Sequence, residues 1–406
     1  MERTVLHCDM NSFYASVELL DYPQLRDVPM AVCGNPKNRH GIILAKNDLA
    51  RKSGVQTAET LWQAKKKCPQ LQCVLPHHDK YRRYHHIINE IYGRYTDMVE
   101  PFSVDESWLD VSGSLKLFGS GKEIADDIRA TVRRETGLTL SAGVSFNKFL
   151  AKMGSEYKKP DATTVLSKEN FRDLLWPLPI GDMFMIGKAT ERKLISLGVK
   201  TIGELACSKR DSLITLLGTL GGDLHDYANG IDERPVALQS ERRKIKSVGH
   251  GITFHRNLTG EEDLRTATLG LADKVCARLR KYQLRAGGVK VEIKDPQFNT
   301  ISRQKQLEYA SSIPEEIAKA AMELIHAGWK KSRPIRLLTI TAISLTDEDS
   351  AVQLTIFDQK NTAHERLEKV SRTIDDIRDR FGDDSITFGR ILGNDIGIRT
   401  DEKKDE

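Results

Sequence analysis

"EPFSVDESWLDVSG", residues 100–113, places two adjacent acids, Asp105 and Glu106, inside an apolar stretch that is typical of a buried strand. Charged side chains are depleted from strands and costly to bury without compensation. An acidic turn between two short strands is one explanation. The other is a cation at the strand end, because Mg²⁺ binds carboxylate and carbonyl oxygens. A third carboxylate elsewhere in the chain would decide between them.

Asp9 is a candidate for that third acid, in "TVLHCDMNSFYASVELL". This segment begins as a strand over residues 4–8 and then changes to helical spacing at Phe13, Val17 and Leu20. Asp9 therefore stands where a strand ends and a helix begins. Strand and helix patterns alternate from there to about residue 166, which predicts an antiparallel sheet that is backed by helices and carries all three acids.

Length and charge restrict the class of protein. The 406 residues are enough for about two to four domains, and the formal net charge is +5. No run of about 18 apolar residues indicates a membrane span, and the first residues do not form a signal peptide, so we expect a cytoplasmic protein. Basic residues outnumber acidic ones over 242–336, and the balance reverses over 347–406. This asymmetry indicates a polyanionic partner for the basic region and a separate role for the acidic tail.

The second half of the chain divides into a small helical region and a second α+β domain. Residues 167–231 are predicted to be all helical, with Gly187 and Gly198 in short turns. Such turns expose backbone N–H groups that bind phosphates, although an ordinary helical hairpin is equally compatible. A polar linker follows. From residue 247 onward, three strand patterns and two helical patterns predict the second α+β domain.

Three motifs resemble those of the Y-family translesion DNA polymerases, in the DinB or polymerase IV branch. They are "DMNSFYASVE" (9–18), "SVDESWLD" (103–110) and "SAGVSFNKFLAKMGSEYKKPD" (141–161), and "MIGKATERKLISLGVKTIGEL" (185–205) resembles the family's helix-hairpin-helix. The resemblance covers about residues 4–346. It implies a multidomain α+β, right-hand polymerase: palm (1–28 and 77–166), fingers (29–76), thumb (167–233), basic linker (234–246), little finger (247–346) and acidic tail (347–406).

The resemblance implies low-fidelity, template-directed DNA synthesis in DNA repair, with two Mg²⁺ ions in the palm. Asp9, Asp105 and Glu106 match the family's three catalytic carboxylates, and the backbone carbonyl of Met10 matches a further metal ligand. One ion would lower the pKa of the primer 3′-hydroxyl, and the other would bind the triphosphate.

Four residues match nucleotide-binding positions. Tyr14 matches the steric gate, whose ring excludes a ribose 2′-hydroxyl. Its neighbour Phe13 belongs to the same motif, although a core aromatic suits Phe13 better. Arg51 and Lys159 match triphosphate-binding positions, where an Arg offers a planar fork and a Lys a compact charge.

The chain departs from the family's pattern at three positions. Asn11 replaces the usual second Asp of the first motif, which is not a metal ligand. Ala45 and Asp48 stand where many relatives have Thr and Tyr at the triphosphate. The lost hydroxyl groups and the added negative charge predict weaker nucleotide binding, unless Lys46 or Asn47 compensates.

The resemblance also assigns DNA contacts and a clamp-binding motif. The DNA-binding residues, which contact phosphates and do not read sequence, are Gly187, Gly198, Arg242, Arg243, Lys244, Lys246 and Arg256. "QLTIFD" (353–358) resembles the motif by which bacterial polymerases bind the sliding clamp, through Gln353, Leu354, Ile356 and Phe357. The implied partners are primer–template DNA, deoxynucleoside triphosphates and the clamp, without a membrane, for an enzyme expected to be a monomer.

Helical spacing of apolar residues over 367–381 predicts an amphipathic helix in the acidic tail, which rests on its own protein or binds a partner. Two alternatives to the polymerase stay open. One is a catalytically weak Y-family paralogue that acts as a DNA- and clamp-bound accessory scaffold, although the presence of all three carboxylates is evidence against it. The other is a helix-hairpin-helix DNA-binding module with an incidental palm. A scaffold would bind DNA without needing Asp105 or Glu106.

Overall fold

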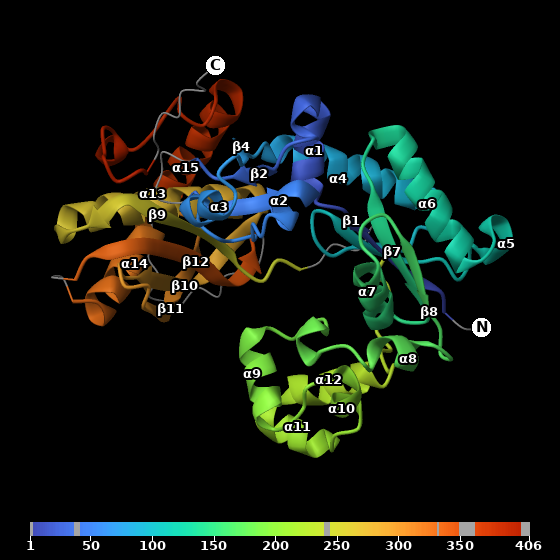
Figure 1. Cartoon of the computed structure of the whole chain (residues 1–406). Helices are drawn as coiled ribbons and strands as arrows, with labels where there is room; N and C mark the ends of the chain where they lie inside the picture. Colours follow the sequence, from blue (N-terminus) through green and yellow to red (C-terminus); the bar gives the residue numbers. More distant parts are fainter. Residues whose placement is uncertain (1–2, 36–40, 239–243, 331–332, 349–361, 399–406) are drawn as a thin grey trace. The chain divides into compact units, whose positions relative to one another are not determined.

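The computed structural model describes residues 3–35, 41–238, 244–330, 333–348 and 362–398, which fall into two compact units (Figure 1). The first unit comprises Met1–Pro36 and Gly41–Arg242, and the second comprises Lys37–His40 and Arg243–Glu406. No helix in these described ranges is long and apolar enough to cross a membrane.

A five-stranded sheet forms the centre of the first unit, in the order β5-β6-β1-β7-β8. Its strands are β1 (Val5–Met10), β5 (Val99–Pro101), β6 (Glu106–Asp110), β7 (Leu140–Ser145) and β8 (Thr163–Leu166). The central strand β1 is antiparallel to both β6 and β7. The predicted antiparallel pairing is therefore confirmed for β1, β5, β6 and β7, whereas β8 pairs with β7 in parallel. Asp9 and Glu106 lie on the sheet, and Asp105 lies just before β6.

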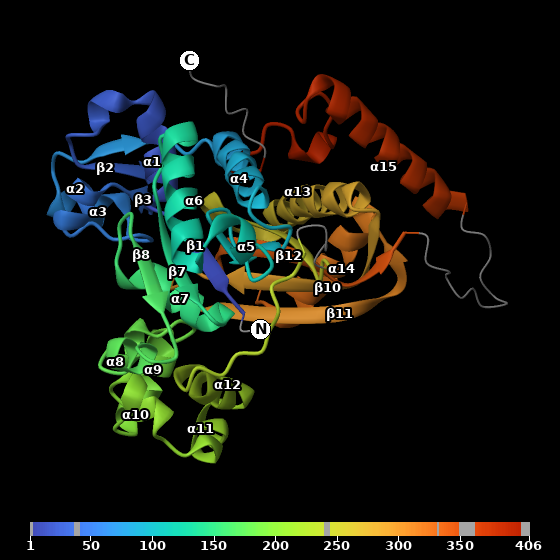
Figure 2. The same cartoon turned by 90° about the vertical axis from the view of Figure 1, so that its right-hand side faces the viewer.

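Helices cover both faces of this sheet (Figure 2). On one face, Leu6, Cys8 and Met10 of β1 pack in a core with α1 (Phe13–Asp21), α4 (His78–Gly93) and α6 (Gly121–Thr136), and α5 (Leu115–Phe118) precedes α6. On the other face lies α7 (Lys148–Tyr157), which contacts β1, β7 and β8. Because side chains alternate along a strand, Val5, His7 and Asp9 point toward α7.

The acidic stretch is not one strand, contrary to the expectation for residues 102–113. The strand β5 ends at Pro101 and β6 begins at Glu106, with a tight connection between them. The backbone N–H of Phe102 donates to the carbonyl of Glu106 at 2.9 Å. The Ser103 hydroxyl donates to the Asp105 carboxylate at 2.6 Å, a local bond that favours a turn over a continuous strand.

The rest of the first unit is a small sheet and a helical cluster. The small sheet has the order β3-β2-β4, from β2 (Met30–Cys33), β3 (Ile43–Lys46) and β4 (Gln72–Val74), with η1 (Pro23–Leu25), α2 (Asp48–Lys52) and α3 (Leu61–Lys67). Residues 167–231 are helical as predicted: α8 (Phe171–Leu175), η2 (Ile180–Asp182), α9 (Lys188–Ser196), α10 (Ile202–Ala206), α11 (Arg210–Leu217) and α12 (Thr219–Ala228). The ring of Phe149 on α7 stacks on that of Tyr227 on α12 with centroids 4.8 Å apart, which joins this cluster to α7.

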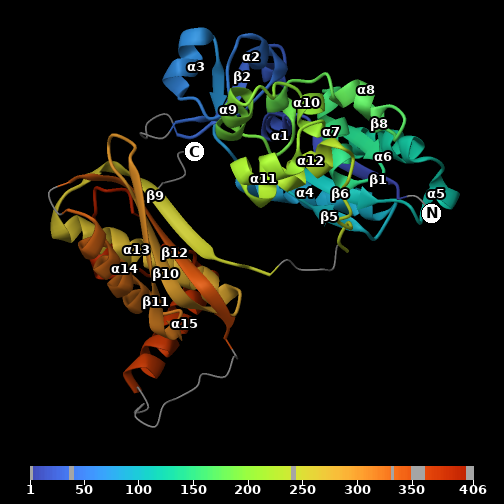
Figure 3. The ribbon, with the colours of Figure 1, turned by 90° about the horizontal axis from the view of Figure 1, so that it is seen from below.

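The second unit is built on a four-stranded sheet in the order β11-β10-β12-β9 (Figure 3). Its elements are β9 (Val248–Leu258), α13 (Gly260–Lys281), β10 (Leu284–Lys294), β11 (Thr300–Ser311), α14 (Pro314–Gly328) and β12 (Ile335–Asp347). The two helices and the sheet share one apolar core. The prediction missed β11, because it is an edge strand whose side chains are mostly exposed and polar, with Ile301 and Leu307 as its apolar contacts to the core.

The described part of the acidic tail packs within the second unit. Helix α15 (Thr362–Phe381) is present as predicted, and its Arg378 forms a two-bond ion pair with the buried Asp273 of α13, each bond 2.9 Å long. Beyond α15, η3 (Gly389–Ile391) and the next residues bury Ile391, Ile396 and Ile398 in the same core. Acids of the tail are partners for basic residues of the unit, so the charge asymmetry along the sequence is resolved within one fold.

Candidate active site

Two of the predicted acids lie side by side on the face of the sheet that α7 covers. Asp9 of β1 is 4% exposed and stands directly opposite Glu106 of β6 in the strand register. Both face α7, since Trp108, two residues after Glu106, packs with Ala151 of that helix. Asp9 is brought to this position by strand alternation, and Glu106 by the turn that starts β6.

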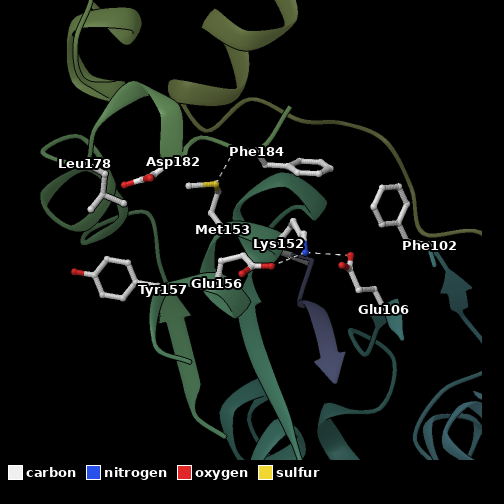
Figure 4. Close-up of a pocket in the computed structure, with 9 residues that line it drawn as sticks. All are labelled: Phe102, Glu106, Lys152, Met153, Glu156, Tyr157, Leu178, Asp182 and Phe184. Atoms are coloured by element: carbon white, nitrogen blue, oxygen red, sulfur yellow. Dashed lines mark hydrogen bonds and ion pairs between the residues drawn. The ribbon is translucent and has the colours of Figure 1, made fainter. Parts of the chain in front are cut away.

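Helix α7 places an ammonium group between these acids. The side chain of Asn147 caps the helix by accepting from the N–H of Leu150 at 2.8 Å. One turn further along, the Lys152 Nζ lies 3.1 Å from Asp9 Oδ2 and 3.0 Å from Glu106 Oε2. It also lies 2.9 Å from Glu156 Oε1 (Figure 4). The cluster therefore already stabilises the positive charge of Lys152.

Burial and the lysines move the pKa values of the acids in different directions. Burial raises the pKa of Asp9 to about 7, although Lys152 and Lys159 oppose that rise. Burial also acts to raise the pKa of Glu106, but the hydrogen bond with His7 and the charge of Lys152 lower it to about 2. Glu106 is thus a permanent carboxylate at neutral pH, and Asp9 depends on nearby cations to ionise.

His7 is a buried neighbour of the acids that the sequence analysis missed. Its Nε2 lies 3.4 Å from Glu106 Oε2, and its Nδ1 lies 2.8 Å from the Ser155 hydroxyl. Burial lowers the pKa of His7 to about 4, so the ring is neutral and orients Glu106 without neutralising it. Its position two residues before Asp9 on one strand is the sequence signal that would have found it.

Asp105 is not in the same group of carboxylates. The acids whose ligand oxygens all lie within 4.8 Å of one another are Asp9, Glu106 and Glu156, among the described residues. Asp105 lies in the turn before β6, where its side chain accepts a hydrogen bond from the Ser103 hydroxyl. The Asp105 carbonyl accepts from the N–H of Met10 at 3.1 Å, which joins the two acid-bearing segments.

The donor set fits a hard divalent cation. Oxygens from Asp9, Glu106 and Glu156 converge, and Mg²⁺ and Ca²⁺ are bound by such oxygens. Glu156, on α7, was missed because its spacing from Lys152 and Lys159 indicates only a solvated helix surface.

A cavity of about 520 Å³ lies beside the start of α1 and α2. Arg51 and Lys159, for which the sequence analysis expects triphosphate binding, both line it, and so do Arg26 and Arg133, which the sequence analysis did not identify. Arg51 donates to the Ser12 hydroxyl at 2.8 Å, which holds its guanidinium at the N-terminal end of α1. The cavity is also lined by Asp48 and Asp161, which pair with Arg51 and Arg133, so the four cations exceed the two acids and leave a net positive lining that suits a polyanionic ligand.

Tyr14 and Phe13 have different environments. Phe13 is 3% exposed and belongs to the core under α1, as the sequence analysis favoured for it. Tyr14 is half-buried, and its ring stacks on Tyr81 with centroids 3.9 Å apart. Burial and then the charge of Asp105 raise the pKa of Tyr14, which indicates that its ring lies near the acidic turn.

Asn11 has a structural role that an aspartate would not reproduce. Its side-chain amide donates to the Ser141 hydroxyl at 2.9 Å, and its oxygen accepts from Thr139 and from the N–H of Asp161. Asn11 therefore ties β7 to the loop that carries Lys159. An ionised carboxylate would lose the bond to Ser141.

Asp48 lies at the cavity that Arg51 lines. Its carboxylate is 3.3 Å from the Arg51 guanidinium, and both side chains are more than half exposed. The two residues expected to compensate for Asp48 both have other contacts. Lys46 donates to the Thr57 hydroxyl, and the buried Asn47 caps α2. Ala45 contributes no polar group.

The predicted DNA-binding residues are only partly described. Gly187 precedes α9, Gly198 has φ +84° in the turn after it, and Lys244 and Lys246 are exposed. Arg256 is engaged by Asp263 at 2.6 Å and Asp395 at 2.7 Å, so its charge is neutralised within its own unit. Outside the described residues lie Arg242, Arg243, Gln353, Leu354, Ile356 and Phe357.

Comparisons with known proteins agree with these observations. The impB/mucB/samB family matches residues 8–156, its C-terminal domain 245–356, and the family's HHH motif 168–199. DNA polymerase IV of Acetivibrio thermocellus is 43% identical over 98% of this chain and 99% of its own. DNA polymerase IV 1 of Bacillus subtilis is 38% identical over 96% and 93%, respectively.

Among solved structures, a Y-family DNA polymerase chimera has the same fold. It superposes with a TM-score of 0.74 and 23% identity, over 84% of this chain and 98% of its own. The multidomain α+β architecture predicted from the sequence is thereby confirmed. The near full-length relatives show that this chain belongs to the impB/mucB/samB family of Y-family DNA polymerases, in the DNA polymerase IV branch.

Proposed function

We propose that the chain is a translesion DNA polymerase, which adds deoxynucleotides to a primer 3′-hydroxyl as a template directs. The observation that carries this proposal is the juxtaposition of Asp9 and Glu106 with a neighbouring cavity that Arg51 and Lys159 line. A carboxylate cluster beside a polyanion site is what phosphoryl transfer to a hydroxyl needs. Nothing in the comparisons favours an accessory scaffold.

The carboxylates would hold two Mg²⁺ ions. When bound, the ions would lower the pKa of the primer 3′-hydroxyl and neutralise negative charge on the phosphates. Asp9 and Glu106 are the residues expected to bind them, with the Met10 carbonyl, and Asp105 would join by turning its side chain from Ser103. Ionised Asp9 is favoured by any added cation, because its raised pKa comes from burial and from the neighbouring acids.

The cations of the 520 Å³ cavity would hold the triphosphate. Lys159 lies between the two regions, since its Nζ is 3.0 Å from Asp9 and its side chain lines the cavity. Primer–template DNA would be bound through phosphates by the turns at Gly187 and Gly198 and by Lys244, Lys246 and the neighbouring arginines. We expect a monomeric enzyme that acts on DNA in the cytoplasm.

Asp48 is predicted to weaken nucleotide binding by competing with the triphosphate for Arg51. Replacing Asp48 with Asn should lower the KM for deoxynucleotides by about two- to five-fold, as expected for an exposed ion pair, and leave kcat unchanged. Steady-state incorporation measures both constants. Asp79→Asn removes a comparable exposed partner, that of Arg82 on α4, and should change neither constant. An unchanged KM in Asp48→Asn would contradict the prediction.

Residues 353–358 are proposed to bind the sliding clamp as an extended peptide. The support is the sequence "QLTIFD" alone, which has a Gln and spaced apolar side chains that fill a pocket. Phe357→Ala should abolish the gain in processivity that a loaded clamp gives and leave clamp-free extension unchanged. Gln359→Ala, just beyond the motif, is the control. A full gain in processivity with Phe357→Ala would exclude the motif.

The translesion activity is tested by extension across an abasic site. The native protein with Mg²⁺ should insert a nucleotide opposite the lesion and extend beyond it, on a template that also carries an undamaged control site upstream. Copying of the upstream site with a complete stop at the lesion would leave a DNA polymerase but remove its proposed role in damage tolerance.

A further inference from the structure

Two lysines are shared between Asp9 and Glu156, one on each side of a ring of alternating charges. The Lys152 Nζ is 3.1 Å from Asp9 and 2.9 Å from Glu156. The Lys159 Nζ is 3.0 Å from Asp9 and 2.9 Å from Glu156. Lys152 also contacts Glu106, and Figure 4 shows its ammonium between Glu106 and Glu156. Glu156 is therefore the acid that contacts both lysines without belonging to the predicted catalytic triad.

Lys152 competes with a metal ion for the same oxygens. An ammonium lies about 3 Å from an oxygen that a bound Mg²⁺ would approach to about 2.1 Å, and the two cations repel each other. When Asp9 and Glu106 act as metal ligands, Lys152 must therefore leave them. The cavity of about 880 Å³ in Figure 4, which Lys152, Glu156 and Phe184 line, has room for that movement.

Glu156 is placed to keep both lysines at the site after such a change. It lies on α7 four residues after Lys152 and three before Lys159, so contacts to both are local. Its side chain is 47% exposed whereas that of Lys152 is 6% exposed, so it stands toward the open side of the cluster. Among the described acids that the two lysines contact, it is the one that the resemblance does not assign to the metal ions.

We propose that Glu156 is a positioning residue that takes over Lys152 and Lys159 when divalent cations occupy Asp9 and Glu106. Glu156 thereby lowers the free energy needed to move Lys152 away from Asp9 and Glu106. It also keeps Lys159 beside the nucleotide cavity. This inference rests on the proposed metal site. Loss of Glu156 leaves Lys152 on Asp9 and Glu106, with no other acid among its contacts to receive it.

The test is a double-mutant cycle in which the affinity of the DNA-free protein for Mn²⁺ is measured for each variant. Electron paramagnetic resonance measures the bound Mn²⁺. Glu156→Gln should weaken binding roughly five- to ten-fold, the size of a coupling between contacting charges. Lys152→Met should tighten binding, because the competing cation is gone and Met keeps the volume. In the Lys152→Met background, Glu156→Gln should have a smaller effect, because only Lys159 then remains to be held away from Asp9. Glu156→Asp should restore native binding.

Each contrary result has a definite meaning. An equal loss of affinity in both backgrounds would overturn the proposal, because Glu156 would then act as a metal ligand or by its own field. No loss in either background would overturn it as well. Absence of Mn²⁺ binding to the native protein would instead overturn the proposed metal site. Glu135→Gln, which removes an ion-paired acid of α6, is the matched control, and thermal melts of each variant establish folding.

Discussion

Replacing Glu106 with Gln is expected to lower the rate of nucleotide incorporation by about a thousand-fold or more, because it removes a charge that holds the reacting groups through metal. Glu106 is a permanent carboxylate in the fold, with its pKa lowered to about 2, and it stands opposite Asp9 in the strand register. Gln keeps the shape and the contact with His7. Single-turnover extension at saturating nucleotide and Mg²⁺ measures the rate.

The control for this variant is the same Glu-to-Gln change at a position away from the predicted catalytic acids. Glu90 is exposed on α4, and Glu90→Gln should extend primers at the native rate. Fluorescence anisotropy should show that Glu106→Gln binds primer–template as tightly as the native protein does. Extension by Glu106→Gln within ten-fold of the native rate would contradict the assignment of Glu106.

Replacing Tyr14 with Ala is expected to reduce discrimination against ribonucleotides by about a hundred-fold. The Tyr14 ring is fixed by its stack on Tyr81 at 3.9 Å and stands near the acidic turn, since Asp105 contributes to its raised pKa. A fixed ring rejects an added hydroxyl group by steric overlap, and Ala removes the overlap. The ratio of kcat/KM for a deoxynucleotide to that for the matching ribonucleotide measures the effect.

Tyr14→Phe separates the ring from its hydroxyl. Phe can keep the stack on Tyr81 and should therefore retain nearly full discrimination. Phe13→Leu, within the core under α1, should affect stability more than sugar selection. Unchanged discrimination in Tyr14→Ala would mean that another residue is the gate.

The sequence predicted the catalytic sheet because its signals are local. Strand alternation and the change to helical spacing located β1, and the apolar residues around Asp105 and Glu106 indicated a strand in the region of β6. Each depends on neighbours within a few residues. The same reasoning failed where local signals conflict: Ser103 and Asp105 close a turn inside an apolar stretch, and β11 carries almost no apolar face.

The remaining parts of the site depend on contacts between distant residues. Lys152 is 143 residues from Asp9, and His7 meets Ser155 across 148 residues, so no spacing rule relates them. The resemblance assigned Arg256 to DNA, whereas Asp395, 139 residues away, pairs with it. A run of basic residues in a sequence predicts a basic surface only when folding brings no acidic residues next to them.

The most direct measurement of the central claim is single-nucleotide incorporation by the native protein opposite each of the four template bases, with Mg²⁺ present and with all metal chelated. The account predicts that only the complementary deoxynucleotide is added to the primer, and only when the metal is present. Tight binding of primer–template without extension at any Mg²⁺ concentration would contradict it.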